Sequence, residues 1–315
     1  MITIAVFNGQ GGIGATSLVY HLAWMFAERG VSVLAADLDP QSNLTAMFLD
    51  EFELASIASG IPSPAGRGAI DTLQTPPLFQ LSSHLALLPG DFKLALQEEE
   101  FARGWLAGGQ DALLVTSRIH RVLAHAGQAK NASVVLIDAG TNLGAINRAA
   151  LIAADFILIP IVPDIFTAVC LSATGPRLSQ WRREWKAMRL ASSEPGQPAG
   201  NMKPIGYVQL HHPRWLSRTN ASLEWRRTIP AAYANSILGE PSPAQTGIDQ
   251  DPNRLAILKY YVSLMPMAME ARKPMFFLKS GDGARGAHLA AVADCYRAFE
   301  HLTSKIAAAC GIAYT

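Results

Sequence analysis

The chain has 315 residues, of which 50% are hydrophobic and 16% are charged, and its formal net charge is +1. This composition excludes a disordered chain and a globally basic nucleic-acid binder, so any contact with DNA or a membrane must use a local patch. The three cysteines, Cys170, Cys295 and Cys310, follow no metal-binding or disulfide spacing, which indicates a reducing, cytoplasmic setting. The N-terminus lacks a basic region and starts with a strand, so we expect no signal peptide.

The first predicted element is a buried strand at residues 2–7, and a glycine-rich loop follows it at once. The loop runs from Gly9 to Gly14 and leads into an amphipathic helix predicted from Thr16 to Arg29, with Gly30 as its C-terminal cap. A strand, a glycine loop and a helix N-terminus together aim backbone N–H groups at a phosphate. This segment therefore predicts an anion-binding site.

Strands and helices alternate through the rest of the chain. Strands are predicted at residues 31–36, 85–88, 134–138, 156–162, 204–210 and 262–265. Helices are predicted at residues 92–99, 111–126, 165–188, 219–234, 253–261 and 288–309, with Gly175 and Pro176 kinking or dividing the third of them. Loops are predicted at residues 52–68, 194–201 and 242–251. The alternation predicts an α/β fold: one domain over residues 1–315 with a doubly wound, mostly parallel sheet flanked by helices.

Two nucleotide-binding motifs overlap in the glycine loop. Gly9, Gly11 and Gly14 fit the G-x-G-x-x-G motif of a Rossmann dinucleotide site, in which Asp37 or Asp39 would hold the ribose. Gly9, Gly14 and Thr16 also fit the P-loop motif G-x-x-x-x-G-K-[ST], except that Ala15 stands in the lysine position. We favour the P-loop because Thr16 and Ser17 place two hydroxyls where that loop needs them.

Carboxylates follow two further strands at the same predicted edge of the sheet. Asp37 and Asp39 lie after the second strand, and Asp138 ends the strand at residues 134–138. A phosphate-bound Mg²⁺ needs a hydroxyl ligand, for which Thr16 is the candidate, and carboxylates that hold its waters, for which Asp39 and Asp138 are candidates. Each feature alone has a simpler explanation, a tight turn or a helix cap, but together they favour an anionic-ligand site.

These motifs resemble those of the ParA/MinD family of P-loop ATPases, nearest its ParA (Soj-like) branch. The deviant Walker A motif of the family, K-G-G-x-G-K-[ST]-[ST], stands here at residues 10–17, and its D-x-D-P-Q-G-N motif stands at residues 37–43 with Ser42 in place of glycine. The Walker B strand matches residues 134–138, and residues 264–274 resemble the C-terminal I-P…E-A…G-K-P-I segment of the family. The resemblance covers nearly the whole chain.

The resemblance implies ATP and Mg²⁺ as cofactors. It assigns nucleotide binding to a contiguous set, Gly9, Gln10, Gly11, Gly12, Ile13, Gly14, Ala15, Thr16 and Ser17. Thr16 would bind Mg²⁺ with Asp138 behind it, and Asp39 would orient the attacking water, so Asp39 and Asp138 are the implied catalytic residues. Family members form a homodimer in the nucleotide-bound state, bind nonspecific DNA or a membrane, and are released by a partner protein that stimulates hydrolysis.

Both lysines of the family motif are missing from this chain. Gln10 replaces the lysine that reaches the nucleotide of the partner subunit, and Ala15 replaces the lysine that holds the β- and γ-phosphates. Residues 139–141 also lack the proline usual after the Walker B aspartate. One lost charge-assisted contact removes about 1.5–3 kcal/mol of binding, and one lost transition-state donor slows a reaction about 10²–10³-fold. We therefore expect weak ATP binding and little or no hydrolysis.

Local basic patches are candidates for DNA contacts. They comprise Arg182 and Arg183 beside Trp181 and Trp185, then Arg226 and Arg227, and more weakly Arg272 and Lys273. The alternative is a solvated helix face whose tryptophans pack inward. The last predicted helix lacks the basic amphipathic pattern of a membrane anchor, so we expect DNA on the nucleoid, not a membrane, as the surface partner.

Three functions remain open at the level of the sequence. The first is a ParA-like switch that positions cargo, such as a plasmid, a chromosome or a protein assembly. The second is a degenerate pseudo-ATPase that acts as a scaffold without nucleotide. The third is a Rossmann oxidoreductase, which NAD(P) binding would indicate.

Overall fold

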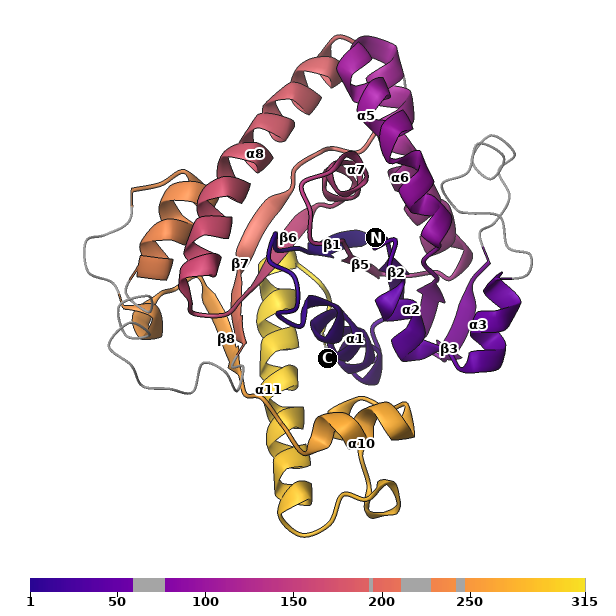
Figure 1. The fold of residues 1–315 in the computed structure, drawn as a ribbon, viewed down its shortest axis with the longest axis vertical. Coiled ribbons are helices and arrows are strands. Elements are labelled where there is room, and N and C mark those ends of the chain that lie inside the picture. Colours follow the sequence, from indigo (N-terminus) through magenta and orange to yellow (C-terminus); the bar gives the residue numbers. More distant parts are fainter. Residues whose placement is uncertain (59–76, 193–194, 211–227, 242–246, 315) are drawn as a thin grey trace.

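The structure, a computed structural model, describes residues 1–58, 77–192, 195–210, 228–241 and 247–314. Its centre is a sheet of eight strands in the order β3-β4-β2-β5-β1-β6-β7-β8 (Figure 1). All neighbouring strands pair in parallel except β3 and β4, which are antiparallel. The strands span β1 Ile2–Val6, β2 Val33–Asp37, β3 Phe79–Ser82, β4 Leu85–Leu88, β5 Val134–Asp138, β6 Phe156–Ile161, β7 Lys203–Leu210 and β8 Arg254–Leu258. The predicted fold class is confirmed.

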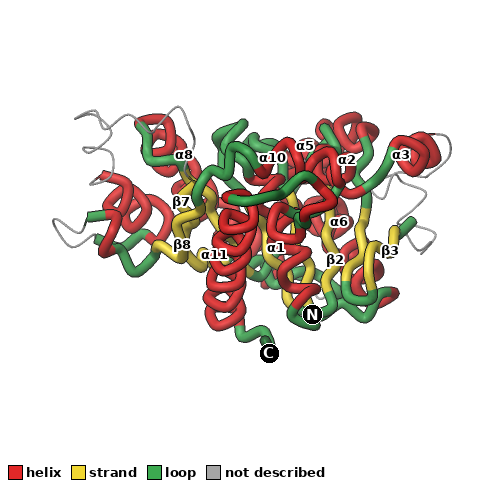
Figure 2. Tube along the Cα trace, turned by 90° about the horizontal axis from the view of Figure 1, so that it is seen from below, coloured by secondary structure: helices red, strands yellow, loops and turns green. Residues whose placement is uncertain are grey.

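Helices cover both faces of the sheet (Figure 2). One face packs against α1 Ala15–Glu28, α2 Asn43–Phe48, α10 Leu264–Ala271 and α11 Ala287–Cys310. The other face packs against α5 Glu98–Ala107, α6 Gly109–Ala129, α7 Ala145–Ala153, α8 Ile165–Leu190 and a π-helix at Tyr233–Leu238. Other elements of the described residues include α3 Glu51–Ala58 and the 3₁₀ turns Phe92–Gln97, Ile248–Gln250, Met275–Phe277 and Ser280–Asp282.

The central strands are buried on both faces, which explains their nearly continuous apolar sequences. Along β1, Ile4 and Val6 face the α1 side, whereas Ala5 faces the α6 side. The strand β5 is buried at every position, including its terminal Asp138. The carboxyl ends of β1, β2 and β5 thus meet at one edge, as expected for neighbouring parallel strands.

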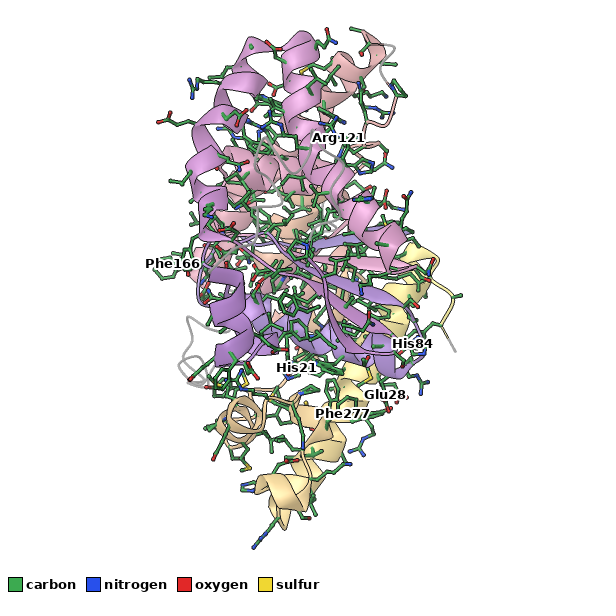
Figure 3. All side chains as sticks on the ribbon, turned by 90° about the vertical axis from the view of Figure 1, so that its right-hand side faces the viewer. His21, Glu28, His84, Arg121, Phe166 and Phe277 are labelled. Atoms are coloured by element: carbon green, nitrogen blue, oxygen red, sulfur yellow. The ribbon has the colours of Figure 1, made fainter. Side chains whose placement is uncertain are left out.

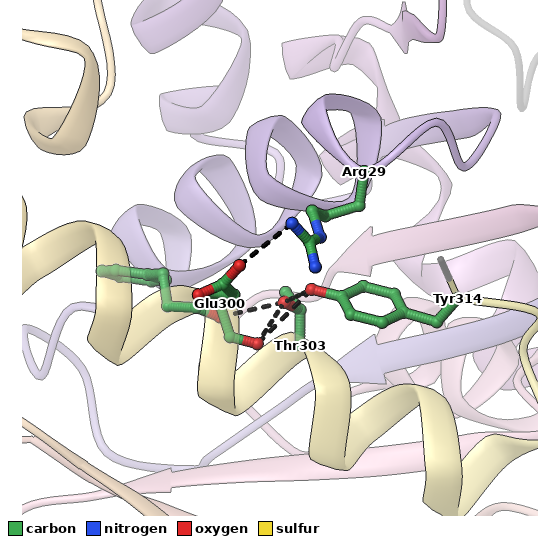
Figure 4. A network of polar contacts seen from close by, with 5 residues as sticks. Arg29, Glu300, Thr303 and Tyr314 are labelled. Carbon is green, nitrogen blue, oxygen red and sulfur yellow. Dashed lines mark hydrogen bonds and ion pairs between the residues drawn. The ribbon is translucent and has the colours of Figure 1, made fainter.

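The C-terminal helix α11 contacts the C-terminal end of α1 (Figure 4). Arg29, just after α1, forms an ion pair with Glu300 of α11 at 3.0 Å and lies over the ring of Tyr314. Tyr314 also contacts the hydroxyl of Thr303 at 2.5 Å. These contacts anchor the helix whose N-terminus begins the candidate site.

Two predicted elements near the C-terminus are wrong. The predicted helix at residues 253–261 is instead the strand β8, because Arg254–Leu258 pairs with the edge of β7. The predicted strand at residues 262–265 is instead the start of α10, which begins at Leu264. Pro266 is tolerated there because it lies in the first turn, where backbone N–H groups have no intrahelical partner. In both places tertiary pairing overrides a weak local pattern.

Smaller differences concern loops and helix limits. Part of the predicted loop at residues 52–68 is the helix α3, whereas residues 59–68 lie outside the described residues. The elements β3, α5 and α7 were not predicted, and α8 runs through Pro176 without dividing. Of the predicted helix at residues 219–234, residues 219–227 lie outside the described residues, and residues 228–234 are helical. Within the part of the chain that the structure describes, no helix is both long and apolar enough to cross a membrane.

Candidate functional site

The glycine loop joins β1 to α1 and has the conformation that its glycines permit. Gly12 and Gly14 have φ angles of +74° and +94°, in the left-handed region that other residues rarely adopt. Gly14 occupies the N-cap of α1, and its carbonyl accepts the first helical hydrogen bond, from the Leu18 amide. The loop therefore leaves the positive end of the α1 dipole open at the sheet edge.

Eight consecutive predicted residues, Gln10 to Ser17, line one cavity of about 770 Å³. Gly9 lies outside the lining of this cavity. The opposite walls come from α2, from Thr141 after β5, and from α10, which sequence reasoning did not connect with the site. Asp39 also lines the cavity, so the predicted loop and one predicted carboxylate do meet.

Asp37 and Asp138 lie beneath the loop as paired neighbours on β2 and β5, each 1% exposed. Asp37 accepts hydrogen bonds from the amide and hydroxyl of Thr45 at 2.8 and 2.7 Å and from the Asp39 amide at 3.2 Å. Burial raises the pKa of Asp37 to about 6, although the Thr45 hydrogen bonds oppose this shift. Asp37 therefore fixes the loop that carries Asp39.

Asp138 has the environment expected for a carboxylate behind a metal ion. The nearby Thr16 side chain stabilises its charged form, and one of its oxygens, Oδ2, is buried without a hydrogen-bond partner. Burial raises the pKa of Asp138 well above its usual value, and the nearby charge of Asp37 raises it further. An unpartnered buried carboxylate oxygen beside a hydroxyl fits the water shell of a phosphate-bound Mg²⁺.

The protein alone does not form a complete metal cage. Among the described residues, no group of three or more His, Cys, Asp or Glu side chains could hold a metal ion. Thr16 and Asp138 therefore fit Mg²⁺ that keeps several waters and takes its other ligands from phosphate oxygens, which is the usual mode for this ion.

Two side chains that the sequence did not single out shape the loop after β5. Asn147 of α7 is buried, and its Oδ1 accepts from the Gly140 amide while its Nδ2 donates to the carbonyls of Gly140 and Asn142. Glu98 of α5 accepts hydrogen bonds from the Ala145 and Ile146 amides at the start of α7. The sequence signal that could have identified Asn147 is an asparagine within an apolar helical pattern.

Gln10 is held by its own chain. Its Nε2 donates to Asp164 Oδ2 at 3.3 Å, and its Oε1 accepts from the Thr167 hydroxyl at 3.1 Å. Asp164 is also the N-cap of α8, where it accepts from the Thr167 amide at 2.7 Å. The Gln10 side chain is thus bound to the start of α8. The ring of Phe166, in the first turn of the same helix, is exposed (Figure 3).

A second, smaller hollow of about 210 Å³ adjoins the loop on the side of β7 and β8. Its walls combine Gly12 to Gly14 with apolar and aromatic side chains that include Leu210, Tyr260 and Met265. Apolar and aromatic walls beside the glycine loop could receive a nucleobase.

The predicted DNA-binding residues fall into three structural groups. Arg226 and Arg227 lie outside the described residues. Arg182 donates to the Met202 carbonyl at 2.8 Å, whereas Arg183 is exposed, and Trp181 and Trp185 pack inward at 2% and 0% exposure. Arg272 and Lys273 line the 770 Å³ cavity that contains the glycine loop. This inward packing of Trp181 and Trp185 agrees with the alternative to DNA binding that the sequence left open, a solvated helix face whose tryptophans pack inward.

His21 links α1 to the C-terminal segment below the site (Figure 3). It is 1% exposed, its Nδ1 contacts the Ser17 carbonyl at 2.7 Å, and its Nε2 accepts from the Met275 amide at 3.1 Å. Its ring also stacks on Phe299 at a centroid distance of 5.0 Å. Burial lowers the pKa of His21 from 6.5 to about 4, so the folded protein keeps this side chain neutral.

We expect His21 to make folding acid-sensitive. Because its pKa is lower in the folded than in the unfolded chain, stability is full above pH 6.5 and falls as the pH drops towards 4, by about 3 kcal/mol at most. Urea unfolding of the wild type and His21→Gln at pH 7, 5.5 and 4.5 measures this effect as the difference between their pH slopes. Asp37, whose raised pKa acts with the opposite sign, is common to both proteins and cancels. Equal pH slopes of stability in the two proteins would contradict the assignment of acid sensitivity to His21.

The family of the chain follows from its similarity to known proteins. A family model described as an AAA domain, AAA_31, matches residues 1–186. The chain belongs to the AAA_31 family. It is a homologue of ParA-like partitioning ATPases, and the P-loop interpretation of the glycine loop is confirmed over the dinucleotide alternative.

Several relatives match part of this AAA_31 chain. A putative replication protein A of Rhizobium rhizogenes is 28% identical over an alignment of 222 positions, which covers 65% of this chain and 54% of that protein. The chromosome-partitioning ATPase Soj of Thermus thermophilus is 31% identical over 166 residues, which are 52% of this chain and 55% of that protein. The chain therefore spans about half the length of the curated relatives it matches.

Solved structures show the same fold over the whole chain. Protein DIP2308 of Corynebacterium diphtheriae superposes with a TM-score of 0.70 at 18% identity, covering 98% of both chains. The ATP complex of a single-residue variant of Cyanothece McdA superposes with a TM-score of 0.65 at 17% identity, covering 100% of this chain and 98% of that one. At 18% and 17% identity, the similarity of this chain to the two structures establishes the shared fold.

Proposed function

We propose that this AAA_31 chain is a ParA-like switch that binds ATP with Mg²⁺, forms a homodimer in that state and positions cargo on DNA with a partner protein. The observation that carries the proposal is the cavity lined by Gln10 to Ser17, where the Thr16 side chain stabilises the charged form of the buried Asp138. The names of the relatives support it, since they include a chromosome-partitioning ATPase and a probable plasmid-partitioning protein ParA.

The residues have separate tasks in this proposal. The amides from Gly11 to Gly14 and the N-terminus of α1 bind the phosphates, and the hollow at Leu210 and Tyr260 takes the base. Thr16 holds Mg²⁺, and Asp138 accepts from its waters. Asp39 faces the same cavity and orients a water at the terminal phosphate. When bound, Mg²⁺ neutralises part of the phosphate charge.

Hydrolysis is proposed to be very slow in this chain. Ala15 adds no cation at the phosphates, and the Gln10 side chain is bound to Asp164 and Thr167. Each missing donor lowers the rate by about 10²–10³-fold, whereas the backbone amides still bind the ground state. The protein then persists in its nucleotide-bound form.

A second candidate, a scaffold that binds its partners without nucleotide, is favoured by one observation. Gln10 is already hydrogen-bonded within its own subunit, to Asp164 and Thr167 at the start of α8. Three apolar side chains in the first turns of α8, those of Ile165, Phe166 and Val169, are 46%, 62% and 60% exposed. An exposed apolar group of this kind can support association before any ligand binds.

Calorimetric titration with ATP and Mg²⁺, with NAD as the control ligand, separates these functions. Saturable binding of ATP without binding of NAD supports the switch, and sedimentation with and without ATP then tests dimerisation. Absence of ATP binding at millimolar concentration, together with a dimer in the free protein, would favour the scaffold and refute the switch.

A further inference from the structure

The cavity that contains the glycine loop needs a source of positive charge. A nucleoside triphosphate carries several negative charges, which one divalent cation neutralises only in part, and the α1 dipole contributes the equivalent of about half a charge. The residues from Gln10 to Ser17 include no lysine or arginine, and Asp39 adds a negative charge to the same lining. His21, which also lines the cavity, is neutral because burial lowers its pKa to about 4.

Two cations do line this cavity, and both come from the far end of the chain. Among the described residues of its lining, the positively charged side chains are Arg272 and Lys273, at the C-terminal end of α10. Arg272 adopts a left-handed conformation with φ of +49°, and its Nη1 donates to the Leu49 carbonyl just after α2. Arg272 thus ties α10 to α2 across the cavity and holds the next residue in place.

Lys273 has the freedom that a ligand contact needs. Its Nζ donates to Asp282 Oδ1 at 2.7 Å, yet its side chain is 44% exposed, whereas that of Asp282 is 15% exposed. An ammonium has three N–H donors on a flexible stem, so one ion pair does not saturate it. An ion pair whose ammonium partner is 44% exposed is also weak, and a phosphate can compete with it.

The position of Lys273 relative to α1 is fixed by a hydrogen bond. Met275, two residues further along, donates its amide to His21 on the second turn of α1 at 3.1 Å. Two residues span at most about 7 Å, so the Lys273 backbone stays close to that turn. Thr16 lies five residues before His21, about 7.5 Å along the helix axis. The flexible stem of Lys273 starts within the same cavity as the phosphate-binding amides.

We propose that Lys273, positioned by Arg272, supplies the side-chain cation for the bound phosphates that the glycine loop itself lacks. The inference rests on the proposed nucleotide site and adds the source of its charge. Ligand binding moves the ammonium from Asp282 to the phosphates, which draws the segment from α10 to Asp282 onto the ligand. Arg272 and Lys273 then act in the nucleotide cavity and not as contacts to DNA.

The test compares the affinity of matched variants for Mg²⁺–ATP and for adenosine by calorimetry. Lys273→Met keeps the apolar stem and removes the charge, so it is expected to weaken Mg²⁺–ATP binding about tenfold and to leave adenosine binding unchanged. Lys273→Arg should restore most of the affinity. Arg285→Ala removes an exposed charge outside the cavity lining and should have no effect. Asp282→Asn frees the ammonium and should tighten Mg²⁺–ATP binding.

Other outcomes distinguish this inference from the proposed function. If Lys273→Met binds Mg²⁺–ATP as the wild type does, or weakens adenosine equally, the inference is wrong while the nucleotide site stands. Loss of DNA binding without loss of Mg²⁺–ATP binding would assign Lys273 to DNA and also overturn it. If the wild type binds no Mg²⁺–ATP, the proposed function fails, and inorganic triphosphate with Mg²⁺ becomes the probe. The inference then requires triphosphate binding that Lys273→Met weakens, and its absence refutes it.

Discussion

Replacing Ala15 with lysine is expected to increase both the ATP affinity and the ATP hydrolysis rate of this protein. Ala15 is the first residue of α1 and lines the cavity that contains the glycine loop. A lysine at this position therefore has room to reach bound phosphates without displacing a core side chain. A new charge-assisted contact should raise the affinity about ten- to a hundredfold, and a new transition-state donor should raise the rate about 10²–10³-fold. Calorimetry and a phosphate-release assay measure the two effects.

Ala15→Met is the matched control for this experiment, since methionine fills similar space without a charge. Its affinity and rate should stay close to those of the wild type. Equal gains from lysine and methionine would show that packing at the start of α1, and not charge, limits the site. No gain in rate from Ala15→Lys would mean that the chain lacks more than this one donor, with Gln10 the next residue to restore.

The glycine loop and the carboxylates at the strand ends could be predicted because their chemistry is local. Gly12 and Gly14 need left-handed backbone, and Asp138 directly follows four apolar residues of a strand, so sequence spacing alone placed both at one edge. The parallel register that pairs Asp37 with Asp138 then follows from the order of the strands. These features depend on neighbours in the sequence or on a general rule of α/β sheets.

Other parts of the site depend on contacts between distant segments and could not be read from spacing. Lys273 was predicted as a weak DNA contact, yet its chain returns to α1 through the hydrogen bond between Met275 and His21, 254 residues apart in the sequence. Glu98 caps a helix that starts 47 residues later. The strand β8 was predicted as a helix because its pairing with β7, not its own sequence, decides its conformation.

Replacing Asp138 with asparagine is expected to stabilise the protein and to weaken its nucleotide binding at the same time. Asp138 is 1% exposed, its Oδ2 has no hydrogen-bond partner, and it lies beside the buried Asp37. A neutral side chain of the same shape removes this electrostatic cost, and we expect a gain of about 1–3 kcal/mol in the free energy of unfolding without ligand. The same change removes the negative charge and one of the two acceptor oxygens available to the waters of Mg²⁺, so the affinity for Mg²⁺–ATP should fall about tenfold.

Opposite signs in the two measurements are what distinguish a ligand-binding carboxylate from a structural one. Urea unfolding of the free protein and calorimetry with Mg²⁺–ATP, each on wild type and Asp138→Asn, give the pair of values. Asp39→Asn is the control: Asp39 lines the cavity and is not deeply buried, so its replacement should weaken Mg²⁺–ATP binding with little change in stability. Loss of stability in Asp138→Asn would instead show that the folded protein depends on this carboxylate itself. We expect the bound ligand to supply the partner that the buried Oδ2 of Asp138 lacks in the free protein.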